Sequence, residues 1–165
     1  MAQTATIATN LFTGFLTATN TGVNSAASTL AADSGVTLAP LPPEHIIAQN
    51  VSAAIAERAL VTKYPAVHVY ADRVRNLLTE KFRTFSGKIR TVAEVRVSQD
   101  RLEGIEDQLR LYVDAVTQVL DGNRGDWGQG AFFAGQYEVA FDPVQQGGKN
   151  FLQVARVSFE VDLSS

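Results

Sequence analysis

The sequence predicts an α+β fold, in which an antiparallel or mixed β-sheet carries a long helix on one face and is preceded by N-terminal helical segments. The later part of the chain repeatedly alternates apolar and polar residues with a period of two, which is typical of half-buried strands. One amphipathic run with helical spacing interrupts these strands. The chain has 165 residues, 45% of them hydrophobic and 19% charged, which suffices for one domain with its own core.

The first forty residues are almost free of charge, with Asp33 as the only ionisable side chain before Pro40. Ile7, Leu11 and Phe15 recur every four residues, which predicts a short helix with an apolar stripe. Such a stripe must be buried, either on its own domain or as an arm on a neighbouring subunit. We therefore divide the chain into residues 1–43, an uncharged helical arm with a Pro-containing linker, and residues 44–165, a single α+β domain.

The middle of the chain contains further helical and strand patterns. Apolar residues spaced three and four apart predict a helix from about Glu44 to Leu60, ended by Tyr64-Pro65. Strand patterns follow at residues 66–70, 82–85 and 88–97, with a polar connection at 72–80 that could hold a helical turn. Ser86-Gly87 separates the last two segments, and we expect either a glycine break or a hairpin there.

The clearest helix follows Asp100, which is expected to cap it while Glu103 reaches back to the cap. Gly122-Asn123 is expected to end it. Its predicted buried face is Leu102, Ile105, Leu109, Tyr112, Val116 and Leu120, and Glu106 forms an exposed pair with Arg110. Two alternating strands, residues 136–142 and 151–163, complete the chain.

The stretch GDWGQGAFFAG, residues 125–135, raises the question of a phosphate-binding loop. Such a loop precedes a helix, so that free backbone donors and the helix dipole face the anion. These glycines follow the predicted helix and match no phosphate-loop pattern. We interpret them as a flexible joint between helix and strand, anchored by Trp127, Phe132 and Phe133.

No catalytic, metal or cofactor site is predicted. The sequence has no cysteine, and its two histidines, His45 and His68, lack the spacing of metal ligands or of an acid–base pair. A net charge of −3 argues against a general nucleic-acid binder. The N-terminus lacks the basic start of a secretory signal, and polar residues interrupt it too often for a membrane span.

Several segments resemble the small tail-terminator, or tail-completion, proteins of long-tailed bacteriophages. They are Tyr64-Pro-Ala-Val-His-Val-Tyr70, Ala93-Glu-Val-Arg-Val-Ser-Gln-Asp100, the helix through Leu-Tyr-Val-Asp-Ala-Val-Thr-Gln-Val-Leu120, and Gln153-Val-Ala-Arg-Val-Ser-Phe-Glu-Val-Asp162. In that family an early strand of this type introduces a mixed domain, with a helix against the sheet. The resemblance covers roughly residues 64–165, and the long uncharged N-terminal region departs from it.

The resemblance implies a homo-oligomer, expected to be a hexameric ring, that caps the tail tube and joins the tail to the head. Its partners would be the tail tube protein and the head–tail connector protein, with DNA only as transiting cargo and no membrane. The protein would reside in the virion, after synthesis in the host cytoplasm. The alternatives are another neck, head–tail joining or tail-tube-like protein and, more distantly, an intracellular protein-binding module.

A ring needs two different complementary patches on each subunit. The candidate interface residues are Ile7, Leu11, Phe15, Arg90, Glu94, Arg96 and Trp127. For the charged residues on the strand, a solvated sheet face is the alternative.

The last two strands suggest where DNA could pass. Glu138, Asp142, Glu160 and Asp162 would gather on one polar side if the strands pair. An acidic lumen of this kind would repel phosphates and keep DNA from adhering. The alternative is the wet face of an antiparallel sheet.

Overall fold

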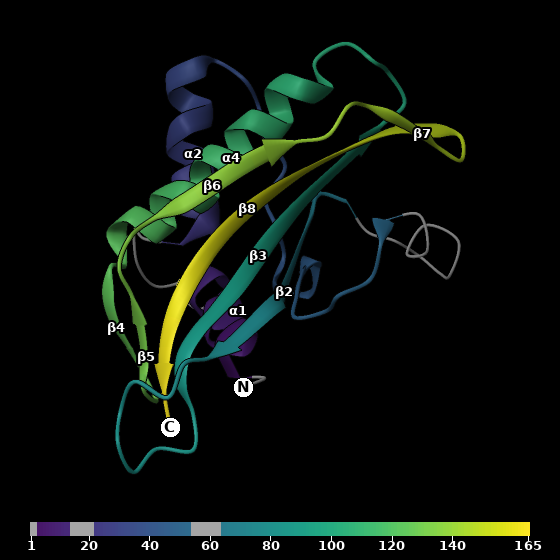
Figure 1. The fold of residues 1–165 in the computed structure, drawn as a ribbon. Coiled ribbons are helices and arrows are strands. Elements are labelled where there is room, and N and C mark those ends of the chain that lie inside the picture. The colour runs from purple at the N-terminus through teal and green to yellow at the C-terminus, as the bar shows by residue number, and fades with distance from the viewer. Residues whose placement is uncertain (1–2, 14–21, 54–63) are drawn as a thin grey trace.

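The computed structural model (Figure 1) describes residues 3–13, 22–53 and 64–165. The predicted fold class is confirmed, because helices cover a mixed sheet of eight strands. The helices are α1 (Gln3–Thr13), α2 (Val23–Ser34) and α4 (Ile105–Gly122), with a short 3₁₀ turn, η1 (Pro43–His45). The strands are β1 (Ile46–Ile47), β2 (Ala66–Asn76), β3 (Ser86–Gln99), β4 (Gly125–Gly128), β5 (Ala131–Phe133), β6 (Tyr137–Phe141), β7 (Gln145–Gly147) and β8 (Asn150–Ser164).

Strand β8 is the centre of the sheet. It runs antiparallel to β3 along the whole length of that strand, from Ser86 opposite Ser164 to Gln99 opposite Phe151. Its other edge pairs successively with β5, β6 and β7. Beyond β3 lies β2, and the short β1 runs parallel to the start of β2. Within the described sheet, β2 and β6 therefore lie on opposite sides of the β3–β8 pair.

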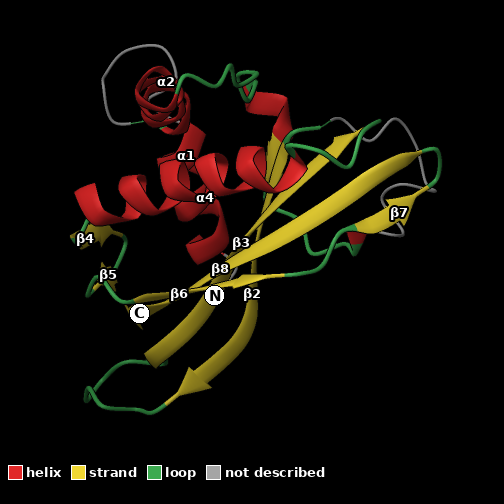
Figure 2. Ribbon diagram, turned by 90° about the horizontal axis from the view of Figure 1, so that it is seen from above, coloured by secondary structure: helices red, strands yellow, loops and turns green. Residues whose placement is uncertain are grey.

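The described helices lie on the same side of the sheet (Figure 2). Helix α4 buries the face predicted for it, except that Leu102 precedes the helix and is exposed. The opposing sheet residues are the alternate positions of β3 and β8. They are buried and belong to the same core, and they are Ile89, Ala93, Val95, Val97, Ala155, Val157, Phe159, Val161 and Leu163. The apolar face of the strands, with its period of two, thus packs against the apolar face of the helix, with its period of 3.6, and both faces are buried in one interface.

The N-terminal helices pack in this core. Thr4, Ala8 and Phe12 of α1 are fully buried, one turn apart, whereas Ile7 is only partly buried. Helix α2 packs on α4 and ends at Gly35, whose left-handed conformation suits glycine. The irregular segment after it is held by two hydrogen bonds between Asn24 and the backbone of Leu41, at 3.0 and 2.7 Å. The described part of residues 1–43 therefore shares its core with residues 44–165.

Residues 44–53 correct the prediction of a helix beginning at Glu44. The 3₁₀ turn ends at His45, and Ile46 and Ile47 then pair with Val67 and His68 as strand β1. Tertiary pairing of two β-branched residues thus overrides their helical spacing. The rest of the predicted helix, residues 54–60, lies outside the described residues.

The region between residues 72 and 88 also differs from the prediction. Strand β2 continues to Asn76, residues 82–85 form no strand, and β3 passes through Gly87 without a break. A Cβ atom at Gly87 would lie 1.8 Å from the carbonyl oxygen of Arg75. This glycine permits a close approach of two strands, so reading it as a strand end was wrong.

Helix α4 begins later than predicted. Its N-cap is Gly104, in a left-handed conformation and without a side-chain cap, so the expected box of Asp100 and Glu103 does not form. Instead, the side-chain amide of Gln99 donates 2.7 Å hydrogen bonds to the carbonyls of Arg101 and Glu103. The predicted exposed pair of Glu106 and Arg110 is present at 3.0 Å.

The glycine-rich stretch is a hairpin of β4 and β5, not a flexible joint. Its turn contains Gly130 with a φ of +81°, where a Cβ would meet the carbonyl oxygen of Ser164 at 2.1 Å. Trp127 and Phe133 pack with Phe159 of β8, with ring centroids 5.2 to 5.9 Å apart. The predicted anchoring role holds for these two aromatic residues, whereas Phe132 is exposed.

Neighbouring phenylalanines give a direct test of this packing. Phe133→Ala should lower the free energy of unfolding by about 3–5 kcal/mol, because it leaves a cavity beside Trp127 and Phe159. Phe132→Ala removes the same atoms from an exposed position and should cost about 0.5 kcal/mol or less. Urea denaturation measures both values. Equal losses would contradict the burial described here.

Candidate interaction surfaces

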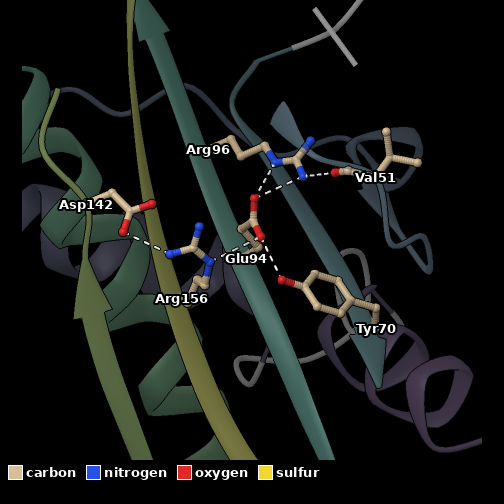
Figure 3. Close-up of polar contacts among 6 residues, drawn as sticks. All are labelled: Val51, Tyr70, Glu94, Arg96, Asp142 and Arg156. Carbon is tan, nitrogen blue, oxygen red and sulfur yellow. Dashed lines mark hydrogen bonds and ion pairs between the residues drawn. The ribbon is translucent and has the colours of Figure 1, made fainter. Parts of the chain in front are cut away.

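The face of the sheet away from the helices carries a buried charge network (Figure 3). The Arg96 guanidinium is fully buried and donates to the Glu94 carboxylate, with Nε 3.0 Å and Nη2 2.9 Å from Oε1. It also donates to the carbonyl of Val51, in the segment after β1. Arg96 thereby holds the segment that contains Val51 against this face of the sheet.

The second oxygen of Glu94 is shared between two neighbouring strands. Tyr70 on β2 donates its hydroxyl to Oε2 at 2.8 Å, and Arg156 on β8 lies 3.6 Å away through Nε. Arg156 in turn donates to Asp142 at 2.8 Å. Glu94 therefore contacts β2 and β8 from the strand between them, and the network joins three strands.

Burial and these charges shift two pKa values strongly. The pKa of Tyr70 rises to about 12, first through burial and then through its hydrogen bond to Glu94. Burial, followed by the nearby charge of Arg96, lowers the pKa of His68 to about 4. His68 is therefore neutral at pH 7, and the positive charge inside this face belongs to the arginines.

The structure separates the predicted interface residues into different environments. Arg90 is partly exposed and lies 3.4 Å from Asp72, and Trp127 is partly buried with its indole donating to the carbonyl of Asn123. Glu94 and Arg96 are 6% and 0% exposed. The expectation that this pair lies on an exposed charged patch is wrong, because both side chains are taken up by the buried network.

The apolar stripe proposed for the N-terminus is only partly visible. Ile7 packs against the core of its own chain. The side chain of Leu11 and all of Phe15 lie outside the described residues.

Three of the four acidic residues of the predicted lumen lie beside basic residues. Glu138 is opposite Ser158 in the β6–β8 register, on the face that also bears Glu160 and Asp162. Lys88 on β3, however, lies 3.8 Å from Glu160 and 3.2 Å from Asp162, and Arg156 pairs with Asp142. The pairing of β6 with β8 thus gathers the four carboxylates on one face together with Arg156, and Lys88 of β3 adds a second cation, while the role of this face as a lumen stays a prediction.

A projecting segment forms the first unlike surface. We define the arm as residues 73–85, the end of β2 and the loop to β3, which extends past the sheet at the bottom of Figure 1. It carries four basic residues, Arg73, Arg75, Lys81 and Arg83, and one acidic residue, Glu80, for a net charge of +3. Large apolar side chains are also exposed on it, namely Val74, Leu77, Leu78 and Phe82.

A second surface, formed by α4 and β6, has the opposite charge. We define the acidic face as the exposed stripe of α4 with the two exposed aromatic residues of β6. The stripe carries Glu106, Asp107, Asp114 and Asp121 with one basic residue, Arg110, for a net charge of −3. Arg110 lies 5.9 Å from the ring centre of Phe141, and Tyr137 donates to Asp121 at 3.2 Å. Helix and strand therefore form one continuous surface.

Sequence reasoning missed both surfaces, although part of their signal was present. Residues 73–83 hold four of the 14 Lys and Arg residues of a chain whose overall charge is negative. That local excess would have indicated a basic segment. The contact between α4 and β6 had no comparable signal, because only the fold brings Asp121 to Tyr137.

Two further searches cover only the described part of the chain. No group of three or more His, Asp or Glu side chains there could hold a metal ion. No described helix is long and apolar enough to cross a membrane.

Comparison of the sequence with protein-family models found no match, and comparison with curated proteins found none either.

The buried network predicts unequal effects of one substitution at two arginines of β3. Arg96→Met should lower the free energy of unfolding by about 3–5 kcal/mol, because Glu94 stays buried after losing its closest cation. Arg90→Met alters the same strand face at a partly exposed pair and should cost about 0–1 kcal/mol. Urea denaturation at pH 7 measures both. Similar small costs would mean that Arg96 does not stabilise the buried carboxylate.

The lowered pKa of His68 predicts a specific loss of stability in acid. Between pH 6.5 and about 4, the unfolded chain binds a proton at His68 that the folded chain does not, so stability falls as the pH falls. The loss attributable to His68 should approach about 1.4 kcal/mol per pH unit in that window. His68→Gln should remove this component, leaving the slope of the carboxylates. If the stability curves of the wild-type protein and the His68→Gln variant run parallel between pH 6.5 and about 4, the contribution of His68 is ruled out.

Proposed function

We propose that this chain is a structural subunit of a bacteriophage particle, a tail-terminator-like protein that forms a ring, caps the tail tube and joins the tail to the head. The observation that carries the proposal is the presence of two unlike exposed surfaces that share no residue, the arm between β2 and β3 and the acidic face on α4 and β6. A ring built from repeated head-to-tail contacts requires two different complementary surfaces on each subunit.

The exposed composition of these surfaces supports an assembly role. Phe82 is fully exposed at the arm, and Phe141 is 44% exposed on the acidic face. Apolar side chains that gather on a charged surface mark sites of protein contact. The element order that resembles the tail-terminator family provides the specific assignment to a phage tail, and hence to the virion.

The described sheet also offers unpaired edges. β6 pairs only with β8, and β2 pairs with β1 only at its first residues. The part of β2 that does not pair with β1 contains Arg73 and Arg75. Its register with β3 also shifts between Ala71 and Arg73. Charges and bulges at an edge limit unspecific strand pairing, so each edge is suited to a defined neighbour.

DNA would cross such a ring as cargo. On the mixed-charge face, the cations of Lys88 and Arg156 offset neighbouring carboxylates. A surface on which charges of both signs are paired has a weak electrostatic potential and attracts the phosphates of a duplex little, in contrast to the basic groove of a DNA-binding protein. This face is our candidate for the surface that DNA passes.

The proposal predicts a closed oligomer. Native mass spectrometry of the purified chain should give one ring species, expected to be a hexamer, either alone or after addition of tail tubes. Electron microscopy should then place that ring at the end of the tube. A chain that stays monomeric at high concentration and also fails to bind tail tubes would refute the proposed function.

A further inference from the structure

The arm and the acidic face match one another in charge and in chemical character. The arm has a net charge of +3, and the acidic face has a net charge of −3. Each combines its charges with exposed apolar groups, aliphatic and aromatic on the arm and aromatic on the acidic face. Opposite potentials that surround apolar contacts are the usual features of a specific protein interface.

Each surface keeps some charges that are not paired within the chain, although Arg83 pairs with Glu80 on the arm, and Arg110 with Glu106 and Arg124 with Asp121 on the acidic face. Within residues 3–13, 22–53 and 64–165, the side chains of Arg73, Arg75 and Lys81 make no ion pair, and neither do those of Asp107 and Asp114. Charges that are already paired gain little from a partner, whereas free charges of opposite sign attract across an interface.

We propose that the arm of one copy docks on the acidic face of a second copy, head to tail, with the apolar side chains of the arm against Tyr137 and Phe141. This inference rests on the proposed function and names the contact that closes its ring. The arm and the acidic face share no residue, so a copy that uses its arm on one neighbour keeps its acidic face for the next. Repetition of one such contact generates a ring or an open filament.

DNA is the other polyanion that a basic arm could meet. Two observations favour a second copy. The arm exposes four large apolar side chains, which phosphates do not recognise, and the chain itself carries an acidic surface of equal and opposite charge. DNA contact is therefore an outcome that the test must separate.

Charge reversal on each surface tests the contact. The arm variant replaces three basic residues by glutamate and changes the arm from +3 to −3; it is Arg73→Glu, Arg75→Glu and Lys81→Glu. The face variant replaces three carboxylates by lysine and changes the acidic face from −3 to +3; it is Asp107→Lys, Asp114→Lys and Asp121→Lys. Circular dichroism and urea denaturation establish that each variant is folded.

Each variant alone should self-associate at least about 10-fold more weakly than the wild-type chain, because like charges then meet at every contact. An equimolar mixture should recover assembly. The reversed, negative arm of one variant fits the reversed, positive face of the other, and the unaltered arm of the second variant fits the unaltered acidic face of the first. Native mass spectrometry should find rings with equal numbers of the two variants in alternation. Assembly of the wild-type chain should weaken as salt rises.

Control variants reverse exposed charges outside both surfaces. Arg101→Glu with Lys149→Glu changes the charge of the chain in the same direction as the arm variant, by four units instead of six, and Asp33→Lys with Asp100→Lys does so for the face variant. Both controls should assemble like the wild-type chain. If they also fail, overall charge rather than the proposed contact governs assembly, and the inference is overturned.

The remaining outcomes separate this inference from the function. Wild-type rings together with normal assembly of either variant alone overturn the docking contact and leave the ring function intact. An arm variant that assembles normally but loses retention of duplex DNA assigns the arm to DNA. A wild-type chain that neither assembles nor binds tail tubes overturns the proposed function as well.

Discussion

The pairing of β8 with its neighbours is the constraint on which the rest of the structure depends. One edge of this strand forms fourteen registered pairs with β3, and the other edge is divided among β5, β6 and β7. Because the side-chain period of a strand is two, this single register places Val157 toward the helices and Arg156 toward the polar network. A slip by one residue would put the arginine into the apolar core and expose the core residues, so the register fixes both faces of the sheet together.

The sequence predicted the elements with strong internal periodicity and failed where distant segments meet. The buried stripe of α4 and the alternation along β3 and β8 follow from local patterns, and the structure confirms them. The segment containing Ile46 and Ile47 was predicted as a helix because its apolar residues also have helical spacing. Only the open edge of β2 makes it a strand. Gly87 was likewise read as a break, since nothing local reveals that the Arg75 carbonyl lies against it.

The candidate site shows the same division. Charged residues on an alternating strand predict a polar face, and Arg90 fits that prediction with its partly exposed side chain. Glu94 and Arg96 have the same alternation but lie under the segment that contains Val51, so they are buried. Alternation identifies the side of a sheet and contains no information about what covers it. The opposite charges of the arm and of α4 are readable in the sequence, whereas the positions of these two segments in the fold are not.

The position of β8 in the chain has a consequence for biosynthesis. Residues 150–164 are translated after every other described strand, yet four of those strands depend on them for their ladder partners. While the ribosome is still making the earlier residues, β6 and β7 have no strand to pair with, β5 has only β4, and β3 has only β2. Loop-closure entropy opposes such long-range pairing until both partners exist. The sheet is therefore completed only after its central strand has been released, and a nascent chain cannot present a finished binding surface to a partner before that moment.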